Sequence, residues 1–494
     1  MQRVALLSGS RVVLVPIGDD DVVLRPPPPP EQVVDVDAAV RDALRFPISG
    51  PPIDAVAPRG GRATIVVEPP VLPLPGVPQD PRQEALAATI AELERCGIPD
   101  ERQTIVVAGG LGRRFGQRDL ERLLPPPQAR AFRGRVLVHD AEGGLLPIVD
   151  TIRIHPALVE ADIVLVVTAA ETVRHGGPGT LIAACNAAAV RGTVEADSLL
   201  EAAGAPEWDL ALQLESALSA KTALIGVSLV LDLPRLTGRY RGYPHDEAAI
   251  RHVVRSPFRM LFSLLPRPLR HDLLSGQSRR ISATAAFAGP PSVAHAEALL
   301  RGVALRGTRL EQPVDALVVG VPWIGPHVPR EPLNPVTSAS IALGIMLRLW
   351  RDAFPIRRDG TLVLVHRLAR SFEHGTQAPY ATMFNALRSA RNAEDLAEAE
   401  LHAGSDGRAL DVYRAGKACH PLQPYADWAG CAPALSRLGR VVVAGSRDAI
   451  AARTLGFVPT RGIASALEMA HGVAGGRARV GILLAPPYSP LLVG

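Results

Sequence analysis

The stretch ADIVLVVTAAETVRHGGPGTL, residues 161–181, joins an apolar run to a glycine-rich loop. Residues Ile163–Val167 are continuously apolar, which is typical of a strand that is covered on both faces of a parallel sheet. The loop His175–Thr180 follows, and an apolar pattern over Leu181–Val190 predicts a helix. A buried strand, a glycine loop and a helix in this order indicate one βα unit of an α/β sheet.

The same alternation of strand and helix patterns continues on both sides of this unit. Further strands are expected over Thr64–Val67, Thr104–Ala108, Arg135–His139, Thr222–Leu231, Ala316–Gly320, Thr361–His366, Val441–Ala444 and Val480–Leu484. Helices are expected over Gln83–Cys96, Arg118–Leu124, Val293–Leu305, Thr337–Trp350 and Ile463–Ala470. Alternation of this kind predicts the α/β class with mainly parallel sheets.

Two changes in composition divide the chain. A proline run at Pro26–Pro30 follows two or three short N-terminal strands, and the region Leu264–Pro290 is rich in Pro, Arg, Ser and Gly. We therefore expect N-terminal strands and a Pro-rich connector over 1–30, an N-terminal α/β domain over 31–275 and a C-terminal α/β domain over 276–494. Two such domains with mainly parallel sheets should enclose a cleft that binds ligands.

Composition excludes several classes of function. Hydrophobic residues make up 47% and charged residues 21% of the 494, which is ordinary for a globular protein. The formal net charge is only +4 and no Lys/Arg run occurs, so no nucleic-acid partner is expected. No apolar stretch approaches the roughly 20 residues of a membrane span, and the N-terminus lacks a signal-peptide pattern. The cytoplasm is therefore the expected compartment, and the oligomeric state stays open.

The segment GGLGRRFG, Gly109–Gly116, follows one of the expected strands. Backbone amides at Gly110 and Gly112, together with the side chains of Arg113 and Arg114, are suited to a cofactor phosphate or a substrate carboxylate. The same spacing also fits a structural turn, and less well a dinucleotide fingerprint.

The segment HGGPGT, His175–Thr180, is the second loop of this kind. His175 is a candidate metal ligand or general base, because imidazole titrates near neutral pH. Arg174 is a candidate partner for a substrate carboxylate, and Gly176 and Gly177 are candidate cofactor-binding amides. The alternative is a turn that needs glycine at positive φ.

Candidates outside the glycine loops are polar residues at strand ends and in irregular segments. His139 ends an expected strand and is a candidate catalytic group, although a hydrogen-bonded structural role fits equally well. His327 and Asn334 precede an expected helix start, and Lys417 and His420 lie in the irregular stretch Tyr413–Trp428. We expect these four to contribute to substrate binding.

Four strand-and-loop segments follow one another along the chain. They are IVVEPPVLPLPG (Ile65–Gly76), TIVVAGGLGRR (Thr104–Arg114), VLVHDAEGGL (Val136–Leu145) with residues 161–181, and VVGVPWIGPHVPREPLNPVTSA (Val318–Ala339). In order and spacing they resemble the nickel-dependent lactate racemase (LarA-like) family. The resemblance implies an isomerase that moves a hydride from the carbon of a small 2-hydroxy acid, with a nickel pincer nucleotide as cofactor.

Several residues depart from the pattern of that family. The family tethers the nucleotide through a lysine in a GGxK loop, and Gly179 occupies this position here. The two lysines of the chain, Lys221 and Lys417, stand in no glycine-rich loop after a strand, and an arginine cannot replace a covalent amine. The family's TGLH histidine corresponds to Gly112. Two hypotheses follow: an isomerase with an altered site, or a catalytically silent or repurposed protein that binds a carboxylate or phosphate ligand.

Overall fold

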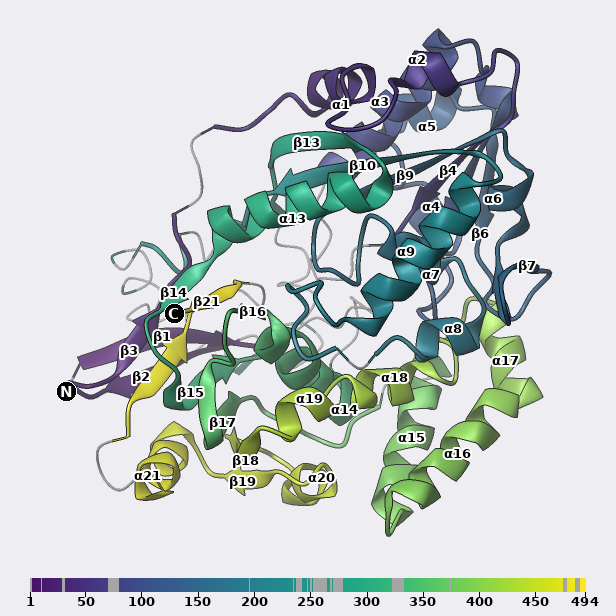
Figure 1. Cartoon of the computed structure of the whole chain (residues 1–494). Helices are drawn as coiled ribbons and strands as arrows, with labels where there is room; N and C mark the ends of the chain where they lie inside the picture. The colour runs from purple at the N-terminus through teal and green to yellow at the C-terminus, as the bar shows by residue number, and fades with distance from the viewer. Residues whose placement is uncertain are drawn as a thin grey trace.

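The computed structural model describes the chain except residues 1, 10, 29–31, 70–79, 195, 234, 237–241, 247, 249–250, 252–263, 267–268, 270–278, 322–332, 373–374, 474–477 and 485–488. In the described part, the main strands form two six-stranded sheets flanked by helices (Figure 1). The α/β class with mainly parallel sheets is thereby confirmed. No helix in the described ranges combines the length and apolar character that a membrane crossing would need.

The first sheet has the order β13-β10-β9-β4-β5-β6. Its strands are β4 (Ala63–Val67), β5 (Gln103–Val107), β6 (Arg135–Val138), β9 (Ile163–Ala169), β10 (Ala223–Leu231) and β13 (Ala283–Gly289). All pairs are parallel except β10 with β13. Every residue of β4 and β9 is buried, as the continuous apolar runs predict.

Helices cover both faces of the first sheet. One face packs on α1 (Val36–Arg45) and α3 (Pro81–Arg95), and the other packs on α7 (Gly179–Ala183) and α9 (Pro206–Ser219). The long helix α13 (Pro291–Arg306) lies along β10 and β13 (Figure 1). The remaining elements of this half are α2 (Ile53–Val56), η1 (Asp100–Arg102), α4 (Gln117–Leu120), α5 (Pro126–Ala131), β7 (Leu146–Val149), β8 (Ile152–Ile154), α6 (Pro156–Glu160) and α8 (Ala187–Arg191).

The second sheet is parallel throughout and has the order β19-β18-β17-β15-β20-β3. Its strands are β3 (Val22–Leu24), β15 (Val314–Gly320), β17 (Ile356–Val365), β18 (Leu438–Ala444), β19 (Val458–Thr460) and β20 (Val480–Leu483). The N-terminal hairpin of β1 (Gln2–Ser8) and β2 (Arg11–Ile17) packs its apolar residues against this sheet. The predicted N-terminal strands are therefore confirmed.

Helical segments connect and cover the second sheet. They are α14 (Pro335–Ala339), a π-helical segment η3 (Ser340–Ile345), η4 (Met346–Arg348), η5 (Gly375–Gln377), α15 (Ala378–Ser389), α16 (Ala393–Ser405), α17 (Gly407–Arg414), α18 (Gln423–Ala429), α19 (Ala432–Leu435), α20 (Ala449–Thr454) and α21 (Ile463–Val473). Short strands β14 (Thr308–Leu310), β16 (Trp350–Arg351) and β21 (Leu491–Val493) form a three-stranded sheet, and β11 (Arg235–Leu236) pairs with β12 (Arg279–Arg280).

Two predicted helices differ from the structure. The pattern over 181–190 folds as α7 and α8, because the backbone of Asn186 between them is extended (φ −65°, ψ 154°). The Asn186 side chain accepts the Arg153 amide proton at 3.0 Å. The pattern over 337–350 folds as α14, η3 and η4 and then enters β16. A π-helical segment inside an apolar helix often marks a functional position.

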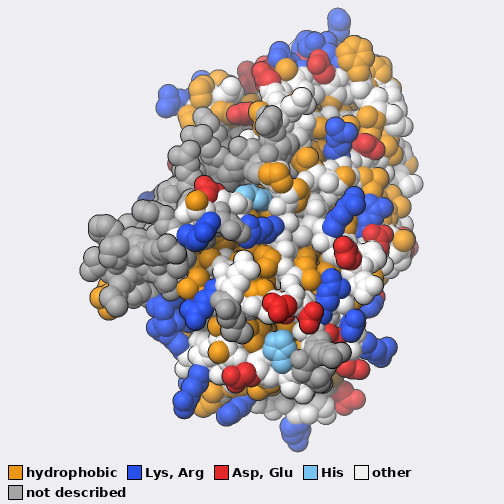
Figure 2. All heavy atoms as spheres, turned by 90° about the vertical axis from the view of Figure 1, so that its left-hand side faces the viewer, with side chains coloured by type: hydrophobic (Ala, Val, Ile, Leu, Met, Phe, Trp, Pro, Cys, Tyr) orange, Lys and Arg blue, Asp and Glu red, His pale blue; other side chains and the backbone are white. Residues whose placement is uncertain are grey.

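The division of the chain between the sheets also differs from the predicted boundaries. β13 and α13 follow residue 275 but belong to the first sheet, because β13 hydrogen bonds to β10 and α13 packs on both strands. β3 precedes residue 30 but forms an edge of the second sheet beside β20. Figure 2 shows acidic and basic side chains interspersed with hydrophobic ones on one face of the molecule.

Candidate functional site

A cavity of about 280 Å³ lies between the two halves of the molecule. Its walls come from loops of the first sheet and from the η3, η4 and α18 segments of the C-terminal half. The charged and titratable side chains in its lining are Glu68, Arg113, Asp119, Arg174, His175, Arg348 and Asp427. The sheets thus enclose the cleft that the α/β pattern predicts.

The first sheet contributes to this cavity through three neighbouring strands. Glu68 follows β4, the loop with Arg113 follows β5, and Arg174 and His175 follow β9. Because parallel strands end at the same edge of a sheet, these three loops meet there. The strand ends therefore place the predicted residues Arg113, Arg174 and His175 in one cavity.

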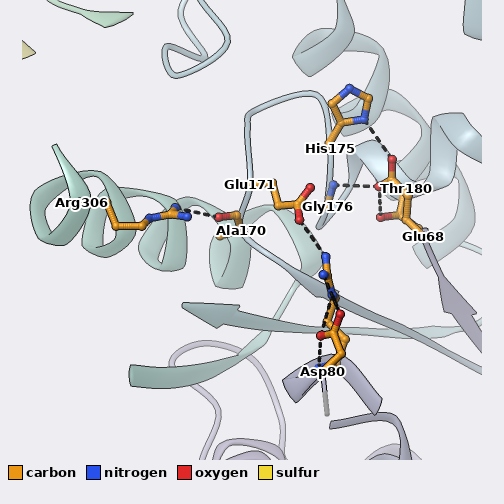
Figure 3. Close-up of polar contacts among 9 residues, drawn as sticks. Glu68, Asp80, Ala170, Glu171, His175, Gly176, Thr180 and Arg306 are labelled. Atoms are coloured by element: carbon orange, nitrogen blue, oxygen red, sulfur yellow. Dashed lines mark hydrogen bonds and ion pairs between the residues drawn. The ribbon is translucent and has the colours of Figure 1, made fainter. Parts of the chain in front are cut away.

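The Glu68 carboxylate holds the His175 imidazole. Glu68 Oε1 lies 3.0 Å from His175 Nδ1, while Oε2 accepts hydrogen bonds from the Gly176 amide at 2.9 Å and Thr180 Oγ1 at 3.1 Å (Figure 3). An ionised carboxylate only accepts, so Nδ1 carries a proton, and in the neutral form of the ring the lone pair is then on Nε2. No described residue bonds to Nε2. This arrangement suits a general base whose tautomer is fixed by a carboxylate.

The amides of the predicted anion loops are already engaged. The Gly176 amide donates to Glu68, and the Gly177 amide donates to Thr168 Oγ1 at 2.8 Å. The Gly110 amide donates to the Ala183 carbonyl and the Gly112 amide to the Gly109 carbonyl. These four glycines therefore shape the loops, and their amides do not form the anion cradle that the sequence predicts.

Arg174 is the free cation of the described cavity lining. Its guanidinium makes no hydrogen bond or ion pair within the described part of the chain. Burial lowers the pKa of Arg174, and the nearby carboxylates of Glu207 and Asp427 oppose this effect. Five unused N–H donors in an enclosed space are suited to a bidentate anion.

The two arginines of the first loop have different surroundings. Arg113 lies in the cavity lining and pairs with Asp119 Oδ2 at 2.8 Å. Arg114 donates to the backbone carbonyls of Val138 and His139, at 3.1 and 3.2 Å, and is not part of the lining. Arg114 therefore joins the loop to β6, and the structure does not place it with the predicted substrate residues.

Arg348 lies in the cavity lining although the sequence analysis does not select it. It donates to the carbonyls of Gly430, at 3.2 Å, and Ala196, and its side chain is almost fully buried. Burial and the nearby Arg174 lower the pKa of Arg348 to about 10. An arginine inside an apolar segment is the one sequence signal that could have indicated it, since lone charges are rarely buried without a role.

Two predicted histidines are buried away from the cavity lining. His139 Nε2 lies 2.8 Å from the Cys185 carbonyl, and burial lowers the pKa of His139 to about 4. His420 Nε2 lies 3.1 Å from Glu142 Oε1, and burial lowers the pKa of His420 to about 4. Both rings are hydrogen-bonded inside the fold, which is the structural role left open for His139.

The remaining predicted substrate residues do not line the cavity either. Asn334 is the N-cap of α14 and accepts from the Thr337 amide at 2.9 Å, because a helix start needs a side-chain acceptor. Lys417 is exposed. His327 lies outside the described residues.

An amine-tethered nucleotide does not fit the described residues. A Cβ built at Gly179 would lie 2.2 Å from the Arg174 carbonyl oxygen, so no side chain fits at this position without a shift of the backbone. Lys221 and Lys417 are both exposed and line no part of the cavity. The described residues also contain no group of three His, Cys, Asp or Glu side chains placed to hold a metal ion.

Comparison with known proteins agrees with the fold. Residues 9–166 match the family model of the lactate racemase N-terminal domain. The structure of the lactate racemase apoprotein from Thermoanaerobacterium thermosaccharolyticum matches with a TM-score of 0.61, 13% identity and 100% coverage of both chains. A protein from Thermotoga maritima matches with a TM-score of 0.48 and 11% identity, covering 93% of this chain and 98% of that one.

A search of curated proteins gave no significant match. At 13% identity, the match to the apoprotein shows the shared fold alone. Residues 9–166 are thus similar to the lactate racemase N-terminal domain, and the whole chain shares the fold of the lactate racemase apoprotein.

Proposed function

We propose that this protein binds a small carboxylate of the 2-hydroxy acid class in the cavity, and that isomerisation of this ligand needs a hydride acceptor bound beside it in addition to the described side chains. Arg174 holds the carboxylate, and His175 exchanges a proton with the hydroxyl group. The observation that carries this proposal is a guanidinium with no partner among the described residues, beside a histidine whose ring contacts Glu68.

The charge of Arg174 supports an anionic ligand. Burial disfavours the charged guanidinium, and no described acceptor satisfies its donors. A carboxylate that accepts two parallel hydrogen bonds would restore the lost solvation and favour the charged form. The fork geometry of arginine also favours a planar carboxylate over a single-point contact.

The size of the cavity supports a small ligand. Its volume of about 280 Å³ lies near the lower limit of about 300–1,000 Å³ that is common for ligand pockets. A short hydroxy acid occupies such a space with its carboxylate on Arg174 and its hydroxyl toward His175. The lining also includes apolar surface at Leu111, Ile182 and Ile345 that suits a short carbon chain.

The Glu68–His175 pair supports acid–base chemistry on the ligand. Nε2 of His175 can accept the proton of a hydroxyl group, and the Glu68 carboxylate then stabilises the imidazolium. Loss of this proton is the step that side chains of the cavity can perform. The tethered nickel nucleotide of the family enters no step here, because position 179 and the two lysines provide no anchor.

The missing anchor favours a second candidate function, which is ligand binding without turnover. Binding needs only the Arg174 cation and the enclosed space, whereas racemisation by hydride transfer also needs a hydride carrier. The two candidates share the same ligand and differ only in whether the hydroxy acid is converted.

Calorimetric titration of the purified protein with D-lactate, L-lactate and inorganic phosphate tests the binding site. We expect lactate to bind and Arg174→Gln to weaken it about tenfold or more, because hydrogen bonds to a charged group contribute about 1.5–3 kcal/mol. The matched control Arg130→Gln changes an exposed arginine on α5 and should leave the affinity unchanged. Equal affinities in the wild type and Arg174→Gln would contradict the proposal.

A racemisation assay separates the two candidates. The protein is produced together with enzymes of pincer nucleotide synthesis, and interconversion of the lactate enantiomers is followed with the wild type and His175→Gln. Loss of turnover in His175→Gln with retained lactate binding supports the isomerase. Binding without turnover in the wild type supports the second candidate, and intact-mass and nickel analysis shows whether any nucleotide is attached.

A further inference from the structure

His295 on α13 reaches under the loop that presents Arg174 and His175. Its side chain is fully buried, with Nε2 2.8 Å from the Thr172 carbonyl oxygen and Nδ1 3.4 Å from Ser228 Oγ. A carbonyl oxygen only accepts, so Nε2 carries the ring proton. Nδ1 then accepts from the serine hydroxyl of β10. One imidazole thereby joins α13, β10 and the loop after β9.

The two glycines of the loop lie directly on this ring. A Cβ built at Gly177 would lie 2.2 Å from His295 Cβ, and one at Gly176 would lie 2.8 Å from His295 Cε1. Both glycines also have positive φ, +94° at Gly176 and +50° at Gly177. The loop backbone and the His295 side chain therefore pack without room for any other side chain.

Thr172, which bonds to His295 through its carbonyl, also bonds to His175 through its side chain. Thr172 Oγ1 accepts a hydrogen bond from the His175 amide at 3.1 Å. His295 thus fixes the carbonyl of Thr172, whose side chain fixes the backbone of His175, while Glu68 fixes the His175 ring. Arg174 lies between the two held residues, so its backbone is set by the same contacts.

The surroundings keep the His295 ring uncharged. The Trp208 ring of α9 stacks at 6.2 Å between centroids and 30° between planes. Burial lowers the pKa of His295 to about 4, which Glu68 opposes and His175 reinforces. A neutral ring has one donor and one acceptor, and both are used by Thr172 and Ser228.

From this geometry we propose that His295 is a positioning residue of the ligand site, and that its Nε2–H···O=C bond to Thr172 sets the orientation of Arg174 and His175. This inference rests on the proposed function. A buried apolar residue would fill the same space, but it would leave the Thr172 carbonyl without its donor. The experiment must therefore separate the effect of the Nε2–H donor from the effect of the ring's volume.

Two substitutions separate donor from bulk. His295→Phe keeps a ring and removes the N–H donor. His295→Gln keeps an N–H donor at a similar distance from the backbone. With L-lactate as the calorimetric probe, we expect Phe to weaken binding about tenfold and Gln to stay within about threefold of the wild type. Equal losses in both variants, at equal stability in urea, would overturn the proposal in favour of packing alone.

A second readout needs no ligand. In ¹⁵N spectra of labelled histidine, the wild type should show His175 with its proton on Nδ1, as Glu68 requires. His295→Phe should give a mixture of tautomers, and His295→Gln should restore the wild-type spectrum. An unchanged His175 spectrum in His295→Phe would overturn the proposal. If the wild type binds no lactate, the proposed function fails while this spectrum still decides the role of His295.

A substitution at Thr172 tests the same hydrogen-bonded connection and leaves the buried His295 side chain in place. Thr172→Val keeps the shape of the side chain and removes the hydroxyl that accepts from the His175 amide. If His295→Phe does not fold, Thr172→Val should still show the tautomer mixture and the weaker lactate binding. A wild-type spectrum and affinity in Thr172→Val would show that the chain of contacts from His295 does not position His175.

Discussion

Lowering the pH should destabilise the fold through its buried histidines. Burial lowers the pKa of His139 and of His295 to about 4, below the ordinary histidine value of about 6.5. Between pH 4 and about 6.5, these histidines are protonated in the unfolded chain but stay neutral in the folded chain. The free energy of unfolding must therefore fall as the pH falls from about 6.5 to 4, and it levels off for these groups below 4.

The magnitude follows from the shift. A difference of about 2.5 pKa units corresponds to about 3 kcal/mol for each of the two rings, with a slope of up to about 1.4 kcal/mol per pH unit for each. His420 acts in the same direction. Burial raises the pKa of Glu215, which acts in the opposite direction because its protonation on acidification relieves a buried charge. Domains are stable by only about 5–15 kcal/mol, so the loss should be large.

Urea unfolding at pH 7, 6, 5 and 4.5 measures this dependence. His139→Gln keeps a donor for the Cys185 carbonyl and should reduce the slope of the free energy against pH by about a third. The matched variant His402→Gln changes a side chain that is 76% exposed on α16 and should keep the wild-type slope. A free energy of unfolding that is constant from pH 6.5 to 4.5 would refute the reasoning, as would an unchanged slope in His139→Gln.

Three substitutions test the loop and its support. Gly179→Lys should lower stability by several kcal/mol, and intact mass after production with the cofactor-synthesis enzymes should show no added nucleotide; a tethered nucleotide would contradict the closed geometry. Gly177→Ala should cost about 3 kcal/mol or more in urea unfolding, because its Cβ would overlap His295; a cost below about 1 kcal/mol would argue against this packing. Arg82→Leu removes the 2.7 Å partner of the nearly buried Glu171 and the 2.8 Å partner of Asp80, and we expect a loss of about 3–5 kcal/mol in thermal or urea unfolding, with a loss under about 1 kcal/mol as the contrary result.

Much of the scaffold was determined by local sequence. Continuous apolar runs such as Ile163–Ala169 predict buried strands, since only a strand covered on both faces tolerates them. Chain order likewise placed the candidates Arg113, Arg174 and His175 in loops after strands, and such loops meet at one edge of a parallel sheet, where the structure brings the three into one cavity. Both inferences depend on periodicity and chain order, which are local properties.

The use of each donor and acceptor was decided by tertiary structure. Glu68 accepts a hydrogen bond from the Gly176 amide, which is 108 residues away in the sequence. His295 donates to the Thr172 carbonyl, which is 123 residues away. Arg348 enters the cavity from a segment with an apolar helical pattern, whereas His139 is turned into the core. Each donor or acceptor group bonds to only a few partners, and the packing of distant segments decides which partners are near enough. The sequence could therefore locate the loops of the site. Packing decided that Arg174 has no partner among the described residues, whereas the glycine amides are hydrogen-bonded.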